Sequence, residues 1–482
     1  MPRALNHLRA YLLAALLLPA GGVAQDLDAP VRYEEDFASA DFHRNRRRAV
    51  VERLPQGAVV VLFGAPSRNR SNDVFYEYRQ ASDLLYLTGT TEAGSALLLV
   101  QDGVEVDRRV VREVLFVPPR DPAQEVWLGR RFGTDRAMER LGVEIAVDAG
   151  RFSEIVTPLL TGGARPVYRL PLPDGIERGT PLADQVGAVL AHTEPAAVPG
   201  VGTGTDTGAR ADTTTLRRIL DELRTIKTDE ELELLRRAID ITAEAHREVM
   251  RQVRPGWAEY EIEALVEYTF KRGGAEQPGF PSIVGSGENS VILHYETNRR
   301  TTAPGDLVVI DVGAEYHGYT ADVTRTIPVS GAFTEEQRAI YDLVLRAQEA
   351  GIRATRAGNP FAQPHQAAAQ VLARGLADLG LIDGPTDARG LRRFFMHGTS
   401  HYLGLDVHDV GTGGPLEPGT VITVEPGIYI APADDVDPRW WNIGVRIEDD
   451  VLVTEADPVI LSAAAPRSGD DVEALMREGG GR

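Results

Sequence analysis

Residues 308–326 read VVIDVGAEYHGYTADVTRT, a stretch that sets two aspartates in apolar surroundings. Asp311 interrupts a run of valine and isoleucine, and Asp322 follows eleven residues later, before a second run rich in β-branched residues. Both runs favour β-strands. Gly313 and Gly318 lie between them and allow a hairpin, so the sequence predicts that the two aspartates lie on facing strands.

Two more acids occupy strand-like positions nearer the C-terminus. Glu425 ends the run at 421–424 just before a Pro-Gly pair, and Glu448 follows a run that includes Arg446. Each acid alone is explained by a solvent-facing strand end or by half of an ion pair. A buried carboxylate, however, costs on the order of several kcal/mol unless it is paired or bound to a metal. Four acids in four apolar strands therefore favour a cation site.

Histidines strengthen this interpretation. Three of the ten fall within residues 395–409, FMHGTSHYLGLDVHD. Glycines and β-branched residues disfavour a helix there, so His397 and His401 are predicted to share one face of an extended strand, with His408 further on. His294 also has apolar neighbours. Mixed oxygen and nitrogen ligands suit one or two ions of zinc, manganese or cobalt, and they do not suit an all-oxygen magnesium site.

Several other chemistries are excluded by the sequence. The chain has no His-Glu-x-x-His motif of zincins and no Gly-x-x-x-x-Gly-Lys phosphate loop. The segment 398–401 lacks the closing glycine of a nucleophile elbow. With no cysteine among 482 residues, disulfides, thiolate nucleophiles and iron–sulfur clusters are also excluded.

The composition is that of a globular protein with an acidic surface. Lysine and arginine number 51 and the acids 71, which gives a net charge of −20. A nucleic-acid partner is not expected, because phosphate contacts require a basic surface. Cations are compatible partners.

Residues 1–24 are typical of an export signal. Arg3 and Arg9 flank the start of an apolar run, 10–18, and small residues precede a cleavage point after Ala24. The run is shorter than the ~20 residues that span a bilayer. An exported protein, periplasmic or secreted, with no stable membrane insertion after signal removal, is predicted. An uncleaved anchor and an organelle transit peptide stay open as alternatives.

The remainder divides into two predicted domains, with overall class α+β. Residues 25–210 are predicted to form an α/β domain that ends in a Pro-, Gly- and Thr-rich linker between 192 and 211. Residues 211–482 are predicted to form a catalytic domain of helices and antiparallel hairpins. The predicted strands are 58–63, 96–100, 114–117, 307–312, 421–425 and 444–448. The predicted helices begin near 213 and after 227, and continue at 259–270, 335–357 and 366–379.

Taken in order, these motifs resemble a known family. The two aspartate segments, then HGTSHYLGLDVHDVG, TVEPGIYI and GVRIEDDVLVTE, are similar to the proline-specific metallopeptidases of the creatinase/prolidase-like "pita-bread" fold, and to aminopeptidase P among them. The resemblance extends upstream through SIVGSGENSVILHY, ASDLLYLTGTTEAGSALLLV and EVWLGRRFGT. It implies a creatinase-like N-terminal α/β domain followed by a pita-bread catalytic domain.

The resemblance also implies roles for individual residues. It implies two divalent metal ions per subunit, with manganese preferred and zinc or cobalt as alternatives. Their ligands would be Asp311, Asp322, His401, Glu425 and Glu448. Catalytic roles would fall to Glu425, His408, His397 and His294, with Glu425 as general base. The three histidines and Arg446 would bind substrate.

The implied reaction is hydrolysis of the N-terminal Xaa-Pro bond of peptides with proline at the second position. One departure is visible, because the family's usual Thr-Glu-Asn reads Glu-Thr-Asn at 296–298 here. Prolidase, a dipeptidase with the same ligands, is the main alternative. Methionine aminopeptidase, metal-free creatinase and a non-catalytic binding protein fit less well. The resemblance also implies a homo-oligomer, either a dimer or a tetramer, because members of the family often form such assemblies.

Overall fold

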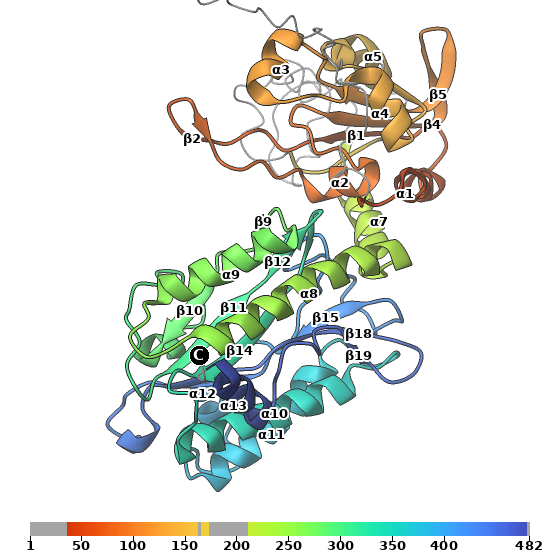
Figure 1. The fold of residues 1–482 in the computed structure, drawn as a ribbon. Helices are drawn as coiled ribbons and strands as arrows, with labels where there is room; N and C mark the ends of the chain where they lie inside the picture. Colours follow the sequence, from red (N-terminus) through yellow and green to blue (C-terminus); the bar gives the residue numbers. More distant parts are fainter. Residues whose placement is uncertain (1–35, 162–164, 173–210, 480–482) are drawn as a thin grey trace, which may run out of the picture. The chain divides into compact units, whose positions relative to one another are not determined.

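Six strands of the N-terminal half form one mixed sheet in the computed structural model, which describes residues 36–161, 165–172 and 211–479. Their order is β6-β5-β4-β1-β7-β8; β1, β4 and β5 are labelled in Figure 1. These strands are β1 (Val59–Phe63), β4 (Ala96–Val106), β5 (Arg109–Val117), β6 (Ile145–Asp148), β7 (Val167–Arg169) and β8 (Ala211–Asp212). The helices are α1 (Ala40–Glu52), α2 (Ser82–Thr88), α3 (Pro122–Leu128), α4 (Gly133–Leu141), η2 (Ala149–Arg151) and α5 (Phe152–Leu160). The three strands predicted here are confirmed.

Burial explains why these apolar runs form strands. All five residues of β1 are buried, and alternate side chains enter two different core clusters on the two faces of the sheet. β4 is longer than the apolar run predicted, because it continues into a hairpin with β5 that turns at Asp107 and Arg108. Apolarity therefore located the buried part of the strand and missed its exposed extension.

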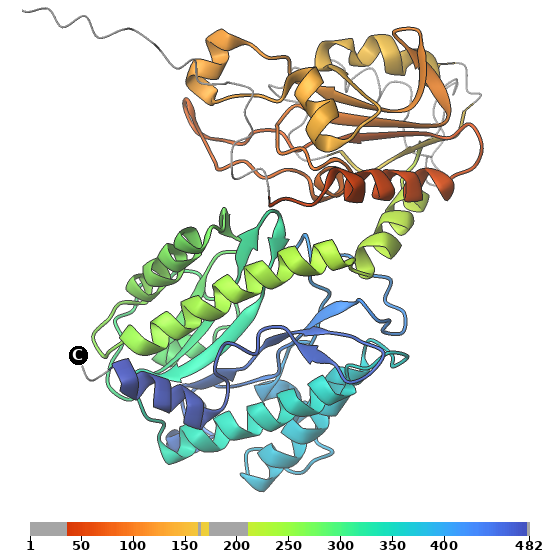
Figure 2. The same cartoon turned by 45° about the vertical axis from the view of Figure 1, so that its right-hand side comes forward.

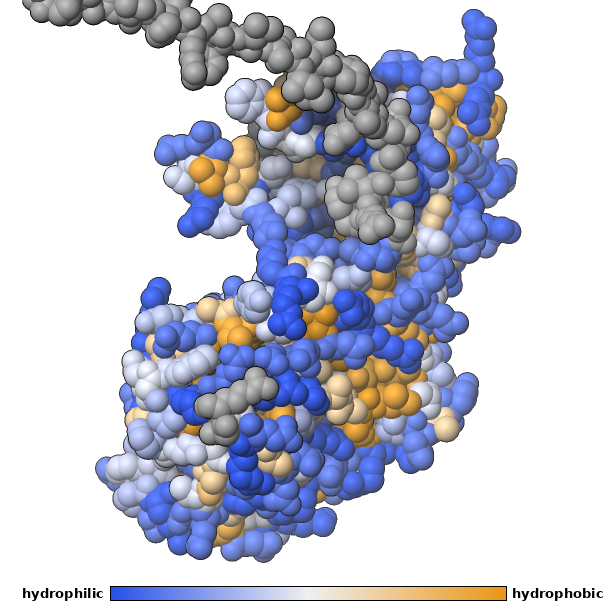
Figure 3. Space-filling view, viewed as in Figure 1, coloured by the Kyte–Doolittle hydropathy of each residue, from blue (hydrophilic) through white to orange (hydrophobic). Residues whose placement is uncertain are grey.

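A small hairpin, β2 (Asn69–Ser71) with β3 (Val74–Phe75), projects apolar side chains to solvent. The face drawn in Figure 3 is mostly hydrophilic, as the acidic composition predicts, and orange atoms interrupt it at this hairpin. Val74 is 50% exposed and Phe75 57%. Exposed apolar residues that adjoin one another can form an interaction surface.

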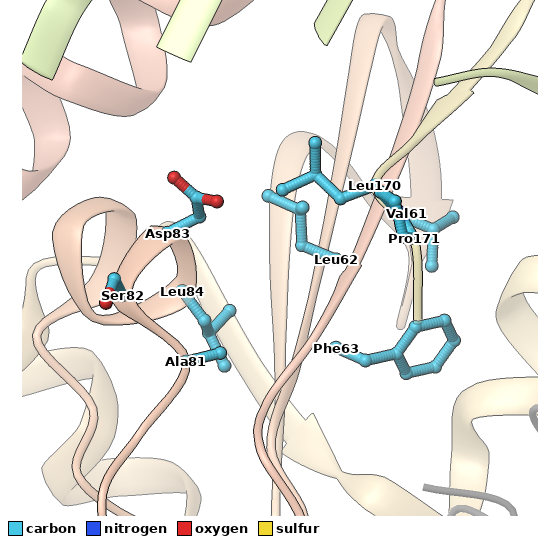
Figure 4. A pocket seen from close by; sticks show the side chains of 9 residues that line it. All are labelled: Val61, Leu62, Phe63, Ala81, Ser82, Asp83, Leu84, Leu170 and Pro171. Carbon is cyan, nitrogen blue, oxygen red and sulfur yellow. The ribbon is translucent and has the colours of Figure 1, made fainter. Parts of the chain in front are cut away.

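A cavity of about 200 Å³ lies in the N-terminal half between α2 and the strand β1 (Figure 4). Its lining is mainly apolar and includes Leu62, Phe63 and Leu170. The one acid in its lining, Asp83, is already bound by Arg217 and Arg224. No residue predicted to be catalytic or metal-binding lines this cavity.

The C-terminal half places its strands between two helix layers. The strands are β9 (Gln277–Pro278), β10 (Ile283–Ser286), β11 (Leu307–Val312), β12 (Ala314–Tyr316), β13 (Tyr319–Thr320), β14 (Val323–Pro328), β15 (Val421–Val424), β16 (Gly427–Ile430), β17 (Ile443–Arg446), β18 (Asp449–Leu452) and β19 (Val459–Ile460). The helices are α7 (Thr214–Thr225), α8 (Asp229–Gln252), α9 (Glu259–Gly273), α10 (Glu335–Ala354), α11 (Gln363–Asp378), α12 (Ala388–Phe394) and α13 (Gly469–Gly479), with the short η3 (Gly287–Val291) and η4 (Pro438–Trp440).

The five helices predicted in this half are present as α7 to α11, whereas α12 and α13 were not predicted. Helices α8 and α9 pack on β10 and β12–β14, while α10 packs on β15–β17 and is covered by α11 (Figure 2). The predicted start of α8 is a capping box, in which Thr228 Oγ1 accepts from Glu231 N and Glu231 Oε2 accepts from Thr228 N at 2.9 Å. The predicted end of α10 at 357 was wrong by three residues, because Thr355 leaves the helical backbone conformation.

The predicted aspartate hairpin is present. β11 and β14 are antiparallel, with Asp311 opposite Thr324, and Asp322 directly precedes β14. A Cβ at Gly313 would lie 1.7 Å from the Ala321 carbonyl oxygen, so only glycine permits this close approach. The intervening β12 and β13 turn through two residues at positive φ, the second of them Gly318.

One predicted strand was wrong. Residues 444–448 do not form a single strand, because β17 ends at Arg446 and β18 begins at Asp449. Glu448 lies in the break, where its backbone N–H donates to the Thr324 carbonyl at 3.1 Å. Arg446 and Glu448 are therefore not neighbours on one face of a single strand. Both side chains instead contact Thr324.

The extended segment predicted for His397 and His401 exists in an irregular form. It forms only isolated β-bridges rather than a full strand, and one of these bridges pairs it antiparallel with β15. Thr423 N donates to the His401 carbonyl at 3.0 Å, and Glu425 N donates to the Thr399 carbonyl at 2.8 Å. The two histidine side chains do approach one common group, Glu425.

Some predictions fall outside the described residues. The export signal at 1–24 and most of the linker between 192 and 211 lie there, and the boundary at 210 stays a prediction. Across the parts of the chain that are described, no helix has both the length and the apolar character needed to cross a membrane.

Candidate metal centre

Three predicted ligands converge most closely. Asp322, His401 and Glu448 each offer an atom within 4.8 Å of the others. His401 Nε2 lies 3.3 Å from Asp322 Oδ2. These residues come from the start of β14, the segment paired with β15 and the break between β17 and β18. The site therefore forms only when segments more than a hundred residues apart in the chain are folded together.

Asp311 joins them from the facing strand β11. Its Oδ2 accepts a hydrogen bond from Arg446 at 2.6 Å, and the same guanidinium donates to the Tyr429 hydroxyl at 2.8 Å and to Thr324 Oγ1 at 3.2 Å. Arg446 is 3% exposed. A buried guanidinium with three such partners fixes Asp311 in one orientation.

Glu425 completes the group from the end of β15. Its two carboxylate oxygens lie 3.7 Å from His397 Nδ1 and 3.7 Å from His401 Nε2. His397 is held by the Tyr429 hydroxyl at 2.9 Å and by the Gly398 carbonyl at 2.6 Å. The carboxylate thus lies between one predicted ligand and one predicted substrate-binding histidine.

Glu448 is fixed by neighbours that do not belong to the predicted set. Its Oε2 accepts from the Thr324 hydroxyl at 2.6 Å, and its backbone carbonyl accepts from Arg325. Arg325 also forms a fully buried ion pair of 2.7 Å with Asp449, the residue after Glu448. This pair locks β14 to β18 directly behind the acids.

The electrostatics of the cluster favour a bound cation. Burial, reinforced by the charges of Asp311 and Asp450, raises the pKa of Asp322 well above its usual range. Burial and the charge of Asp322 do the same to the pKa of Glu448. Burial raises the pKa of Glu425 to about 7, against the opposing influence of His401. Acids that repel one another in this way are stabilised by multivalent cations.

Hydrogen bonding gives an independent test of the fit. The buried oxygens Asp311 Oδ1 and Asp322 Oδ1 have no hydrogen-bond partner among the described residues. A buried polar oxygen without a partner carries a desolvation cost of about 1–3 kcal/mol. Carboxylate oxygens and one imidazole nitrogen form a donor set that suits manganese, zinc or cobalt. The residues present therefore fit a divalent metal centre.

The remaining predicted residues lie at the rim. The rings of His401 and His408 meet edge to face with centroids 4.4 Å apart. Burial, His401 and His294 together lower the pKa of His408. Both His294 and His408 are exposed. The structure thus brings the nine predicted site residues toward one centre; their roles stay predictions.

The loop that carries the sequence departure at 296–298 is held by Asn298. Asn298 is buried and has a left-handed φ of 49°. Its Oδ1 accepts from Val284 N at 3.1 Å and its Nδ2 donates to the Ser282 carbonyl at 2.8 Å. The asparagine that the family pattern shares thus helps to anchor this loop, while the exchanged Glu296 and Thr297 are exposed.

Two functional-site neighbours were missed at the sequence level. Tyr429 bonds both His397 and Arg446, and burial raises its pKa to about 12. Thr324 bonds Glu448 and Arg446. Their only signal in the sequence is a position inside a motif beside an acid, since a strand tyrosine or threonine is otherwise ordinary.

With this geometry in place, comparison with known proteins decides the family. A profile of the Metallopeptidase family M24 matches residues 233–455, and one of the Aminopeptidase P N-terminal domain matches residues 43–168. Xaa-Pro aminopeptidase from Escherichia coli is 41% identical over 454 residues, covering 92% of this chain and 98% of the relative. The chain belongs to the aminopeptidase P family of metallopeptidases.

Solved structures agree with this assignment. Aminopeptidase P from E. coli with the inhibitor Pro-Leu has a TM-score of 0.82 and 39% identity, covering 92% of this chain and all of that one. Pseudomonas aeruginosa aminopeptidase PepP has a TM-score of 0.82 and 36% identity over 92% of this chain and all of that one. The α+β fold class, with an aminopeptidase P-type first domain before a metallopeptidase domain, is confirmed. A metal-dependent peptidase of this family uses divalent ions.

Proposed function

We propose that this aminopeptidase P family member hydrolyses the N-terminal Xaa-Pro bond of peptides, using two divalent ions, with manganese preferred. The observation that carries the proposal is the convergence of Asp311, Asp322, His401, Glu425 and Glu448 on one buried centre. Relatives from E. coli and Haemophilus influenzae, matched over 92% of this chain, bear the name Xaa-Pro aminopeptidase. The matched first domain favours this activity over prolidase.

The chemistry can be assigned to residues of the chain. Bound cations supply Lewis acidity, which lowers the pKa of water and polarises a carbonyl. Glu425 Oε takes a proton from the attacking water and gives it to the leaving proline nitrogen, the part of a general acid–base residue. His408, at the exposed rim, donates to the carbonyl oxygen as negative charge develops there.

Other residues hold these groups in position. Burial lowers the pKa of His397 to about 4, so its ring is neutral at neutral pH and its nitrogens bond the Tyr429 hydroxyl and the Gly398 carbonyl. Arg446 donates hydrogen bonds to both Asp311 and Tyr429 and so fixes the two side chains relative to each other. Because proline lacks an N–H and has a fixed φ, its peptide bond requires such a dedicated site.

A peptide-length series tests the activity. With manganese, we expect cleavage of Ala-Pro-Ala-Ala and of an Arg-Pro-Pro peptide before proline, and loss of activity on chelation with recovery on metal addition. Hydrolysis confined to the dipeptide Ala-Pro would instead establish a prolidase. Activity unchanged after verified metal loss would falsify the metal mechanism. Mass spectrometry of the products reports the cleaved bond.

We propose further that the protein is exported, with residues 1–24 removed, and acts in the periplasm or outside the cell. The support is the charged start, the short apolar run and the small residues before Gln25. A homo-oligomer is also proposed. Large apolar side chains on α3 support it, because Val126 is 81% exposed and Trp127 85%.

One measurement tests both statements. Native mass spectrometry of protein recovered from the outer compartment is expected to give a subunit that begins at Gln25 and an assembly mass of two or four subunits. An intact 52.4 kDa subunit would contradict signal removal. A single-subunit mass at working concentration would contradict the oligomer.

A further inference from the structure

Glu259, the first residue of α9, is completely buried and fastens both ends of one loop. Its Oε1 accepts from the backbone N–H of Ser286 at 2.8 Å, from the hydroxyl of Ser286 at 2.7 Å and from Asn289 Nδ2 at 3.0 Å. Its Oε2 accepts from Arg300 N at 2.8 Å, and its own N–H donates to the Arg300 carbonyl at 2.9 Å. One carboxylate thus holds the start and the end of residues 286–300.

The middle of this loop carries His294. The next residue, Tyr295, directs its hydroxyl to the Glu259 carboxylate, and the pKa of Tyr295 is raised by burial and by that contact. The carboxylate therefore reaches the loop at its two ends and at the residue that adjoins the histidine. Since His294 and Tyr295 share a peptide bond, holding Tyr295 restricts the backbone at His294.

The loop is also tied to the metal centre on its other side. The carbonyl of Leu293 accepts from Arg446 at 3.3 Å, and Arg446 binds Asp311 at 2.6 Å. Because Leu293 precedes His294 directly in the chain, this contact holds the backbone beside His294 at the centre. His294 is thus flanked by Leu293, which contacts the site, and by Tyr295, which contacts Glu259.

A helix-capping role does not account for Glu259. The side chain that caps the start of α9 is that of Glu261, whose Oε2 accepts from Ala258 N at 2.7 Å. Within the described part of the chain, the side-chain hydrogen bonds of Glu259 go to the loop 286–300. Burial of a carboxylate costs free energy, and several hydrogen-bond donors offset this cost. The resulting charge-assisted bonds fix the orientation of the groups that donate them.

We propose that Glu259 is a positioning residue that holds His294 at the metal centre for the Xaa-Pro reaction. This inference rests on the function proposed above, because it assigns His294 a part in substrate binding. Glu259 itself does not touch the centre, so its effect on turnover is transmitted entirely through the loop.

A double-mutant cycle tests the proposal. Glu259→Gln replaces an acceptor oxygen with an amide donor facing backbone donors, and we expect kcat/KM for Arg-Pro-Pro to fall about ten- to a hundredfold with metal content unchanged. On a His294→Ala background the same change should alter kcat/KM by less than about threefold. Equal losses on both backgrounds would overturn the proposal.

The matched control is Glu276→Gln. Glu276 also accepts from a backbone N–H, that of His317 at 2.9 Å, but on the β12–β13 turn. Any effect it has should be the same on both backgrounds. If Glu259→Gln fails to fold, Asn289→Ala removes one bond to the carboxylate and keeps its charge; a smaller loss that also disappears with His294→Ala is expected.

A second readout does not depend on turnover. Hydrogen exchange of the metal-free protein should show at least tenfold faster amide exchange at 291–300 in Glu259→Gln than in wild type, and no such change in Glu276→Gln. Unchanged exchange in this segment would contradict the positioning role even if the enzyme were active. An inactive wild type with the expected exchange pattern would instead reject the proposed function alone.

Discussion

Replacing Glu425 with glutamine is expected to lower kcat about a thousandfold while the protein stays folded. Glutamine keeps the size and one oxygen, and the backbone bond from position 425 to Thr399 remains. It cannot take a proton from water or return one to the proline nitrogen, and loss of general acid–base catalysis typically costs about 10²–10⁴ in rate. Steady-state kinetics on an Arg-Pro-Pro peptide, at verified metal content, measures the effect.

The control is Glu417→Gln, an exposed acid on the loop before β15. It makes the same chemical change without reaching the centre, so its kinetics should equal those of wild type within about twofold. A Glu425→Gln variant that binds metal fully and loses less than tenfold in kcat would remove Glu425 as the proton carrier.

Replacing Asp322 with asparagine is expected to abolish tight metal binding and, with it, activity. Asp322 faces His401 at 3.3 Å and is one of the three donors that converge most closely. An amide oxygen carries no charge and is a weaker ligand. Metal analysis after dialysis should find the content reduced, and peptide hydrolysis should return only in part at high manganese.

In the absence of metal, Asp322→Asn is expected to raise the stability of the folded protein. The pKa of Asp322 is raised by burial and neighbouring acids, so the folded state holds the proton more tightly than the unfolded state does. Stability of the metal-free wild type therefore falls as pH rises from the ordinary aspartate value through the raised one. Asp322→Asn removes this loss and should be the more stable protein at pH 7 by chemical denaturation. If the variant were less stable than wild type, the cost of burying ionised Asp322 would have to be offset by other contacts in the fold, and the prediction would be wrong.

The sequence predicted most of the fold because its signals were local. Apolar runs located β1, β11 and β15, and the helix predicted to begin after 227 is α8. Gly313 is informative for the same reason, since no other residue tolerates the Ala321 carbonyl at that distance. Where the local sequence pattern agrees with the tertiary environment, the pattern alone predicts the secondary structure.

The failures came where tertiary contacts override the local pattern. Residues 444–448 look like one strand, but Glu448 turns out of the ladder to bond Thr324 and to face Asp322. Tyr429 looks like an ordinary strand residue and is the hydroxyl that joins His397 to Arg446. Such partners come from residues far away in the chain, and no short-range periodicity encodes them.

The convergence of acids from β11, the start of β14, the end of β15 and the break before β18 has a thermodynamic consequence. The unfolded chain holds these donors far apart, so a cation binds the folded state almost exclusively and its binding free energy adds to the free energy of unfolding. At a free ion concentration one hundred times the dissociation constant, each ion adds ~2.7 kcal/mol. Resistance to unfolding and catalytic competence are thus set by the same free metal concentration.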